Sequence, residues 1–415
     1  MPSISMTDIP YILKTKFAGR VVSSVYKKIM LLNQIKFSNA DIERGARTVN
    51  HSARLTRNNG TGFRSTSGAR PTLPKSSGSQ GGQPSVEVKS LYGYCEFDGP
   101  AIRATLNDAG SFARLVQDEL IELSDSMTIE MNRAAYGWGS GQLGFVDTLS
   151  GAPNNYINLY DTFASPLYNI EWFDEGQYID FFTAAGADHG EYKITQVDKA
   201  NKRLYFSTDP VAGGVVQGDI AYIAGNRNAE PMGLMGFADD GSYVANLHGV
   251  VNTFSRWNGY VDDNTTLAAF RAFDETKLRQ LIQWIKRTGD KNLLLTTSQN
   301  IVTKIGGVIK STMLEAASEV LKGGFMAIKY MGIPIYEDVY HPEYHIFGAN
   351  LDNLKGQQLY PGGEFGAISF LDLDGKELHR VEGEDAYYVN AVADYELSTQ
   401  RRNAFGRYSD IDWTL

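Results

Sequence analysis

The sequence is poor in the residues that most often build covalent and catalytic sites. Its 415 residues include one cysteine, six histidines and 13 prolines. A single cysteine cannot form a disulfide within the chain, which favours a reducing cytoplasm. No apolar run comes near the twenty residues needed to cross a membrane, and residues 1–20 lack the apolar core and cleavage pattern of a signal peptide. We therefore expect a chain without an internal disulfide or a spanning helix.

The overall composition is typical of a globular protein. Hydrophobic residues make up 42% and charged residues 21%, both near the averages for folded proteins. With 42 glycines the sequence predicts many tight turns, while the low proline content argues against proline-rich linkers. The length is enough for two or three domains' worth of buried core.

Charge is distributed unevenly along the chain. Up to Arg103 there are 15 lysines and arginines against 6 acids, whereas the remainder has 24 against 42. The basic first part can bind the phosphates of a nucleic acid, or it can lie on the acidic body of a neighbouring copy. We favour the second interpretation, because the acidic body would repel nucleic acid.

The first hundred residues predict two extended features. Residues 1–45 have too few apolar side chains to form their own core, which predicts an arm that docks on other structure. The composition of residues 57–85 fits a disordered linker, but strand-like alternation around Val49 and Val86 favours the tip of a long hairpin. Such a hairpin would project up to roughly 80 Å, so we expect it to lie on adjacent subunits. Its basic and large apolar residues are Arg57, Arg64, Arg70, Lys75, Phe63 and Leu73.

The clearest helix in the sequence spans about residues 108–136. Its apolar residues recur every three or four positions, as on one stripe of an amphipathic helix. Asp108 can cap its start and Gly137 its end, and the helix would be about 40 Å long. The stripe consists of Phe112, Val116, Leu120, Leu123, Met127, Met131 and Ala134.

The rest of the chain divides into two patterns. Residues 148–229 contain short alternating runs separated by turns, which predicts a small all-β module, either a sandwich or a barrel. From residue 231 onwards helices and strands do not alternate regularly, so a parallel doubly wound sheet is not expected. The patterns there predict helices at 275–288, 298–305 and 311–324, strands on either side of Met331–Gly332, and a long strand at 386–400.

Patterns that usually indicate catalysis or ligand binding are weak. His341 and His345 have the spacing of a helical zinc pair, but Pro342 denies them a shared helix face. The glycines of YGWGSGQLG follow a helix rather than a strand, so they predict a helix stop and not a dinucleotide loop. Cys95 lies in a strand-like segment, where a small inert side chain is the expected role. We accordingly assign no catalytic, cofactor-binding or metal-ligating residue.

Several segments and the order of the elements carry a resemblance to a known family. The segments are LVQDELIELSDSMTIEMNRAAYGWGSG, EPMGLMGF, KNLLLTTSQN, YMGIPIYEDVY and VNAVADYELSTQRRNAFGRYSD. An arm, a long hairpin, a long helix that runs into a glycine-rich turn, a mixed α/β region and a late strand follow one another along the chain. This arrangement resembles the major capsid proteins of tailed phages. Their Hong Kong ninety-seven-like fold is shared with encapsulin shells.

The resemblance implies an α+β fold with an inserted all-β domain on the outer surface. It also implies a domain order, which we state as an expectation. The order is an N-terminal arm at 1–45, an extended hairpin called the E-loop at 46–105, a peripheral domain with the spine helix at 106–147, the all-β insertion at 148–230, an axial domain at 231–385, and the closing strand and C-terminus of the peripheral domain at 386–415.

The function implied by the resemblance is structural and not enzymatic. Hexamers and pentamers of the chain would form an icosahedral shell around double-stranded DNA, assembled in the host cytoplasm and kept in the virion. The partners implied are further copies of the chain, a separate scaffolding protein, a portal and a decoration protein, with no membrane and no cofactor. The residues expected in contacts between subunits are Arg57, Phe63, Arg64, Arg70 and Lys75.

Two other functions stay open at this point. One is an encapsulin-like shell that encloses a protein cargo instead of DNA. The other is a carbohydrate-binding or polysaccharide-processing protein, in which aromatic side chains of the all-β module hold a sugar. The aromatic residues considered for that role are Trp138, Tyr156, Tyr160, Tyr168 and Trp172.

Overall fold

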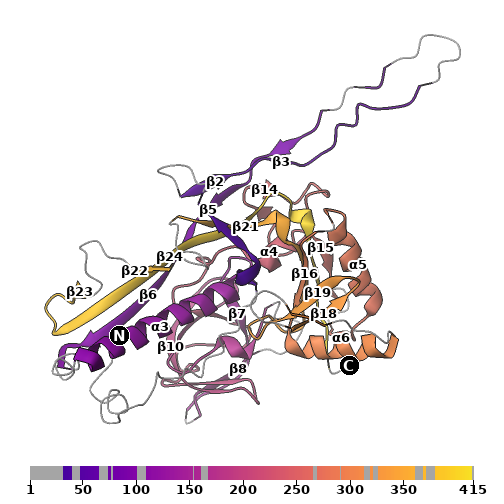
Figure 1. Ribbon diagram of the computed structural model, residues 1–415. Coiled ribbons are helices and arrows are strands. Elements are labelled where there is room, and N and C mark those ends of the chain that lie inside the picture. The colour runs from indigo at the N-terminus through magenta and orange to yellow at the C-terminus, as the bar shows by residue number, and fades with distance from the viewer. Residues whose placement is uncertain are drawn as a thin grey trace.

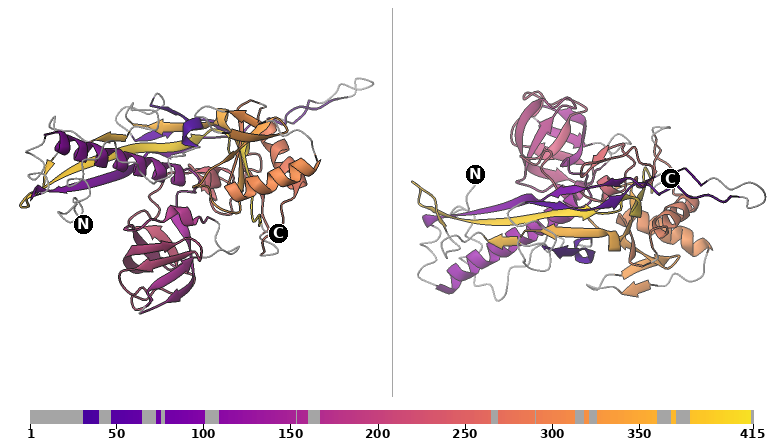
Figure 2. Two further views of the ribbon diagram at one scale, coloured as in Figure 1. Left: turned by 60° about the horizontal axis from the view of Figure 1, so that its bottom comes forward. Right: turned by 90° about the horizontal axis from the view of Figure 1, so that it is seen from above.

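The chain forms an elongated body with a long hairpin at one end and a barrel on one side (Figure 1 and Figure 2). The computed structural model describes residues 31–39, 47–64, 73–75, 78–100, 109–152, 154–159, 167–264, 269–289, 291–312, 318–320, 326–359, 368–370 and 379–413. Most of the predicted arm lies outside these residues, as do Arg70, Tyr160 and the predicted helix cap Asp108.

A six-stranded sheet runs along the elongated body. Its longest strand, β24 (Ala386–Thr399), pairs along one edge with β6 (Lys89–Asp98), and this confirms the long strand predicted late in the sequence. Along the other edge of β24 lie β21 (Leu354–Gln358), β22 (Ile368–Phe370) and β23 (His379–Arg380), and β1 (Lys36–Ser38) adds to β21 in parallel. The short turns η1 (Leu32–Gln34) and η3 (Leu351–Asn353) precede β1 and β21.

The predicted long helix is α3 (Ala109–Ala134), and it packs along one face of this sheet. Met127 and Met131 are buried, as the apolar stripe predicts. The helix and sheet approach each other closely at Gly93 of β6, where a Cβ atom would lie 2.6 Å from the sulfur of Met127. A side chain at this position would force the Met127 side chain to move, so glycine allows the helix and the sheet to approach this closely.

The predicted all-β module is a closed barrel. Its strands are β7 (Gln142–Ser150), β8 (Tyr156–Leu159), β9 (Tyr178–Phe182), β10 (Asp188–Asp198), β11 (Arg203–Phe206) and β12 (Ile220–Ile223). Along β8 and β11 buried and partly exposed residues alternate, because successive side chains of a strand point to opposite faces. The interior is filled by Leu143, Val146, Ile157, Ile179, Phe181, Ile194, Leu204 and Phe206.

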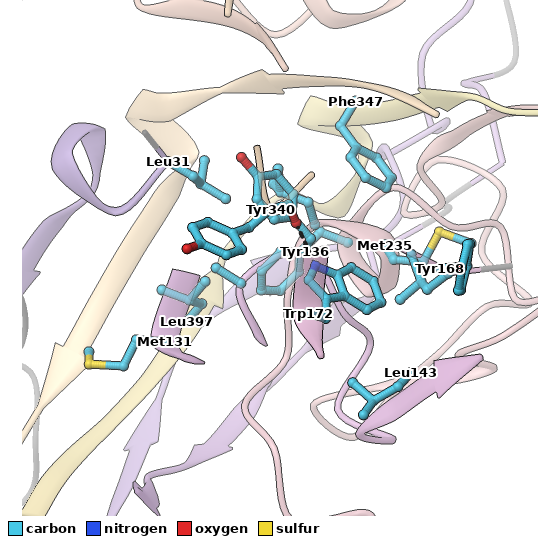
Figure 3. Close-up of a cluster of buried hydrophobic side chains, with 14 of the residues drawn as sticks. Leu31, Met131, Tyr136, Leu143, Tyr168, Trp172, Met235, Tyr340, Phe347 and Leu397 are labelled. Carbon is cyan, nitrogen blue, oxygen red and sulfur yellow. Dashed lines mark hydrogen bonds between the residues drawn. The ribbon is translucent and has the colours of Figure 1, made fainter. Parts of the chain in front are cut away.

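The barrel is fixed to the body at two places. The chain segments that enter and leave it pair with each other through Trp138 and Met232, just before the short helix α4 (Leu234–Phe237). A second attachment lies around the turn η2 (Ile170–Trp172), where Nε1 of Trp172 donates a hydrogen bond to the carbonyl oxygen of Tyr340 over 2.8 Å. Figure 3 shows that this contact lies in a buried cluster to which the long helix, the barrel and both sheets contribute.

A seven-stranded mixed sheet forms the other end of the body. In spatial order its strands are β15 (Tyr260–Asp262), β25 (Phe405–Tyr408), β20 (Ile346–Asn350), β16 (Leu293–Thr297), β19 (Ile333–Glu337), β18 (Met326–Tyr330) and β17 (Ser318–Val320). The helices α5 (Glu275–Lys286) and α6 (Gln299–Thr312) pack on one of its faces. The predicted strands around Met331–Gly332 are confirmed, and both turn residues have positive φ.

One prediction for this region needs correction. The short helix predicted at 311–324 is wrong at Ser318–Val320, which pair with β18 as an edge strand. Ser318–Val320 form a strand because β18, the next strand along the chain, pairs with them, and this pairing overrides the local helical pattern. The domain boundary expected at residue 385 stays a prediction. The strands β21, β22 and β23 precede it and lie with β24 in the long sheet, while β25 follows it and lies in the seven-stranded sheet.

A buried charge cluster joins the segment after β24 to the loop that follows α4. Nη2 of Arg402, in the turn η4 (Arg402–Ala404), lies 3.1 Å from the carboxylate of Asp239, and Nη2 of Arg407 lies 3.4 Å from it. All three side chains are essentially inaccessible to solvent. Asp263, which is partly exposed, lies 3.6 Å from Arg407. Asp239 is thus the buried anion that balances two buried guanidinium groups.

The buried carboxyl group of Glu396 makes the free energy of unfolding depend on pH. Glu396 of β24 accepts hydrogen bonds from the backbone N–H groups of Met232, over 2.6 Å, and Leu397, over 3.1 Å. Burial raises the pKa of Glu396 from 4.5 to about 8. The unfolded chain therefore ionises at a lower pH than the folded one, and the free energy of unfolding falls as pH rises from 4.5 to about 8.

We expect Glu396→Gln to remove this pH dependence. The amide oxygen can accept the same two backbone hydrogen bonds but cannot ionise, so the variant should be more stable than the natural chain by about 4 kcal/mol at pH 8 and by almost nothing at pH 4. Denaturant unfolding between pH 4 and pH 8 measures the difference, with the exposed Glu175→Gln as the control. An unchanged pH slope in Glu396→Gln would show that another group is responsible.

Candidate interaction surfaces

The predicted long hairpin is present and leaves the body at one end (Figure 1). Its stem is built from two short antiparallel pairs, β2 (Thr48–Asn50) with β5 (Ser85–Glu87) and β3 (Ala53–Arg54) with β4 (Gly81–Gly82). Beyond Leu55 the described residues of the two branches form no strand. The hairpin thus consists of a paired stem and a long extended tip.

The stem is anchored in the body. Val49 and Val86 are fully buried, and Nη2 of Arg47 lies 2.8 Å from the carboxylate of Asp394. The backbone N–H of Ser85 donates a hydrogen bond over 2.8 Å to the carbonyl of His248, in the turn between β13 (Asn246–Leu247) and β14 (Val250–Val251). These contacts fix the direction in which the hairpin leaves the body.

The tip exposes the residues that a contact surface would use. Phe63 is fully exposed and Leu73 is 89% exposed, although apolar side chains of this size are normally buried. Arg57 and Lys75 are also exposed, and Arg64 lies beside Phe63, whose carbonyl it contacts through Nη1 over 3.0 Å. Four of the five predicted contact residues therefore lie on this projecting tip, and the fifth, Arg70, is outside the described residues.

Sequence reasoning missed a second exposed surface, on β6. Tyr92 is 70% exposed and Tyr94 is 42% exposed, and both lie on the face of the long sheet opposite α3. The Tyr94 ring stacks on Tyr388 with ring centres 5.8 Å apart, and its hydroxyl donates to Glu96 over 2.9 Å. Burial and the adjacent Glu96 carboxylate raise the pKa of Tyr94 to about 12. The signal was available in the sequence, because Tyr92, Tyr94 and Glu96 occupy alternate positions of a predicted strand.

The aromatic residues considered for sugar binding do not form a platform. Tyr168 and Trp172 are buried between the barrel and the body. Trp138 packs against Tyr243, with ring centres 5.2 Å apart, and the Arg203 guanidinium covers Tyr156 at 4.6 Å. The described aromatic side chains of this set are thus used in packing, which contradicts the sugar-binding alternative for them.

The structure also shows where the histidines, the cysteine and the glycines of the weak site patterns lie. His341 and His345 are buried, and burial lowers the pKa of His341 to about 3. The Cys95 thiol has its pKa raised to about 12 by burial, as expected for an unreactive cysteine. Gly139 and Gly141 have positive φ in the turn after α3 and lead into a strand, so the predicted helix stop is confirmed.

Among the described residues no group of three or more histidine, cysteine, aspartate or glutamate side chains is arranged to hold a metal ion. No helix in this part of the chain is long and apolar enough to cross a membrane.

Comparisons with known proteins identify the fold. No protein-family model and no curated protein matches the sequence. Among solved structures, the cyanophage A-1(L) capsid asymmetric unit is 12% identical with a TM-score of 0.58, and the match covers 98% of each chain. An encapsulin of Synechococcus elongatus PCC 7942 is 8% identical over 99% of this chain and 98% of its own, with a TM-score of 0.49. The capsid of a native GTA particle is 11% identical over 99% and 100%, with a TM-score of 0.48. The cyanophage match spans nearly all of both chains, and the chain therefore has the Hong Kong ninety-seven-like fold of phage capsid proteins.

Proposed function

We propose that this chain is the major capsid protein of a tailed phage and assembles through hexamers and pentamers into a closed icosahedral shell around double-stranded DNA. The observation that carries the proposal is the hairpin. Its stem is locked into the body, while its basic tip extends away from the body with Phe63 and Leu73 exposed. Such a segment gains stability only when another molecule covers it.

Charge supports another copy of the chain as the partner. The tip carries basic residues, and the chain beyond residue 103 has an excess of 18 acidic residues. A neighbouring copy therefore offers a surface of opposite charge, which guides association and fixes its register. Enclosed DNA would be held without sequence-specific contacts, and a separate scaffolding protein, a portal and a decoration protein are the further partners that we propose.

We also propose how the fold divides in such a shell. The long sheet and α3 form the peripheral domain, and the seven-stranded sheet with α5 and α6 forms the axial domain around the five-fold and six-fold axes. The hairpin is the E-loop and the barrel is an insertion on the outer surface. The acidic character of the barrel supports this placement, because residues 142–223 carry 11 acids against 4 lysines and arginines, and packed DNA repels negative charge.

Reversing the charge of the tip tests the proposal. Arg57→Glu/Arg64→Glu/Lys75→Glu should leave the body folded but reduce the yield of closed shells at least tenfold, because the tip would then repel its acidic neighbour. Electron microscopy and sedimentation of the purified variants measure the yield, and the charge-conserving Arg57→Lys/Arg64→Lys should assemble normally. Normal shells from the charge-reversed chain would show that the tip makes no contact that assembly needs. Natural shells filled with protein instead of DNA would favour the encapsulin-like alternative.

A further inference from the structure

The sequence contains two Asn-Gly pairs, and they lie in different surroundings. Asn59–Gly60 is in the hairpin tip, where Asn59 is exposed, whereas Asn258–Gly259 is in the body, where Gly259 is buried. In such a pair the backbone nitrogen of the glycine can reach the side-chain amide carbon of the asparagine, because glycine has no Cβ atom in the way. Attack by that nitrogen is the first step of asparagine deamidation. The surroundings of each pair therefore decide whether it can react.

Contacts within the body hold the pair Asn258–Gly259. The N–H of Gly259 donates a hydrogen bond over 3.1 Å to the carbonyl of Asp239, and Nδ2 of Asn258 donates one over 2.9 Å to the carbonyl of Asn252. A Cβ atom at Gly259 would lie 2.8 Å from the carbonyl oxygen of Phe237, so this backbone is packed closely against the end of α4. Both reacting groups are thus fixed, and bringing them together requires local unfolding of the body.

The tip holds Asn59–Gly60 through exposed side chains. Nε of Arg57 donates a hydrogen bond over 3.3 Å to Oδ1 of Asn59, and the N–H of Gly60 donates one over 2.8 Å to Oδ1 of Asn58. Water competes for both bonds, because Arg57, Asn58 and Asn59 are all exposed. The tip can therefore reach the geometry of attack while the body stays folded. A guanidinium beside Oδ1 also stabilises the negative charge that develops on this oxygen during attack.

We infer that Asn59 is a site of self-modification, at which the folded chain converts asparagine to aspartate and isoaspartate. The Gly60 nitrogen gives its proton to water and forms a bond to Cγ of Asn59, and the bond from Cγ to Nδ2 breaks. Nδ2 leaves with a proton from water as ammonia, and a succinimide ring remains. Water then opens the ring at Cγ, which gives aspartate, or at the backbone carbonyl carbon, which gives isoaspartate. The sum consumes one water and releases one ammonia, with no oxidant or reductant.

Each conversion changes the charge of the tip. Residues 57–85 contain four basic residues and no acid, so the formal charge of this segment falls from +4 to +3. The new carboxylate forms where Oδ1 of Asn59 now accepts from Arg57, so it would pair with that guanidinium. The consequence for assembly rests on the proposed function: a copy outside a shell would slowly lose the charge that attracts its acidic neighbour.

Peptide mass spectrometry tests the inference on the purified chain, separated by sedimentation from any assembled shells. The chain is kept at mildly alkaline pH, and conversion is measured as a mass gain of about one dalton and as methyl transfer by an isoaspartyl methyltransferase. We expect Asn59 to convert at least tenfold faster than Asn258 in the folded chain, and the two to convert at similar rates in denaturant. Gly60→Val should slow conversion at Asn59 at least tenfold in both states, because its branched side chain blocks the nitrogen.

The outcomes separate this site from the proposed function. Equal conversion of Asn59 and Asn258 in the folded chain, or an Asn59 that stays unchanged while the denatured chain converts, would overturn the inference and leave the capsid proposal standing. The mass change needs no assembly, so a chain that converts at Asn59 but never forms closed shells supports the site and contradicts the capsid proposal. Undiminished conversion in Gly60→Val would show that the Gly60 nitrogen is not the attacking atom, which also overturns the inference.

Discussion

Removing the hairpin tip is expected to abolish closed shells without unfolding the chain. Residues 57–79 can be replaced by an Asn-Gly turn, since the backbone N–H groups of Leu55 and Thr56 already bond the carbonyl of Gln80 across the stem. The deletion removes Phe63, Leu73 and all four basic residues of the tip but keeps the buried stem. The expected products are monomers or small oligomers.

Thermal unfolding and electron microscopy of the deletion variant measure the two effects separately. The melting temperature should stay within a few degrees of that of the natural chain, because the described tip residues bury little surface in a single copy. A control in which residues 58–62 are replaced by serine and glycine keeps Phe63 and all four basic residues and should still form shells. Normal shells from the deletion variant would mean that the hairpin is not an assembly element.

Removing the charge of Asp239 is expected to destabilise the fold strongly. Asp239→Asn would leave Arg402 and Arg407 buried without their buried anion, a change that typically lowers the free energy of unfolding by about 3–5 kcal/mol. The same carboxylate accepts hydrogen bonds from the backbone N–H groups of Tyr243 and Val244, so the loop after α4 should loosen as well. Denaturant unfolding at neutral pH measures the loss.

The neighbouring Asp240 provides a matched control. Its side chain is exposed and bonds Ser242, so Asp240→Asn should change the free energy of unfolding by no more than about 0.5 kcal/mol. The double variant Asp239→Asn/Arg402→Met should lose less than the two single variants together, because one of the unpaired charges is gone. Equal losses for Asp239→Asn and Asp240→Asn would show that the buried cluster does not stabilise the fold.

The sequence was enough to predict the elements whose periodicity appears among neighbouring residues. The apolar stripe of the long helix and the strand-like flanks of the hairpin are both found. Each depends on a period of 3.6 or 2 residues and on turn residues nearby, which a sequence displays directly. The order of such elements was also enough to indicate the fold.

Features that depend on distant partners could not be predicted in the same way. β21 lies in the long sheet because it pairs with β24, and β25 lies in the seven-stranded sheet because it pairs with β20. In the sequence, Arg402 and Arg407 look like surface charges of a polar segment, and only the folded chain brings Asp239 to them. The exposed surface of β6 is different, because the alternation of Tyr92, Tyr94 and Glu96 was visible in the sequence and only the exposure of the two tyrosines required the structure.

High-resolution electron microscopy of the purified chain shows whether its copies build a shell through the hairpin. We expect closed icosahedral particles in which density for each hairpin runs from its own stem to the body of an adjacent copy. Isolated compact chains, with the basic hairpin folded back on the molecule that bears it, would contradict self-assembly into a shell.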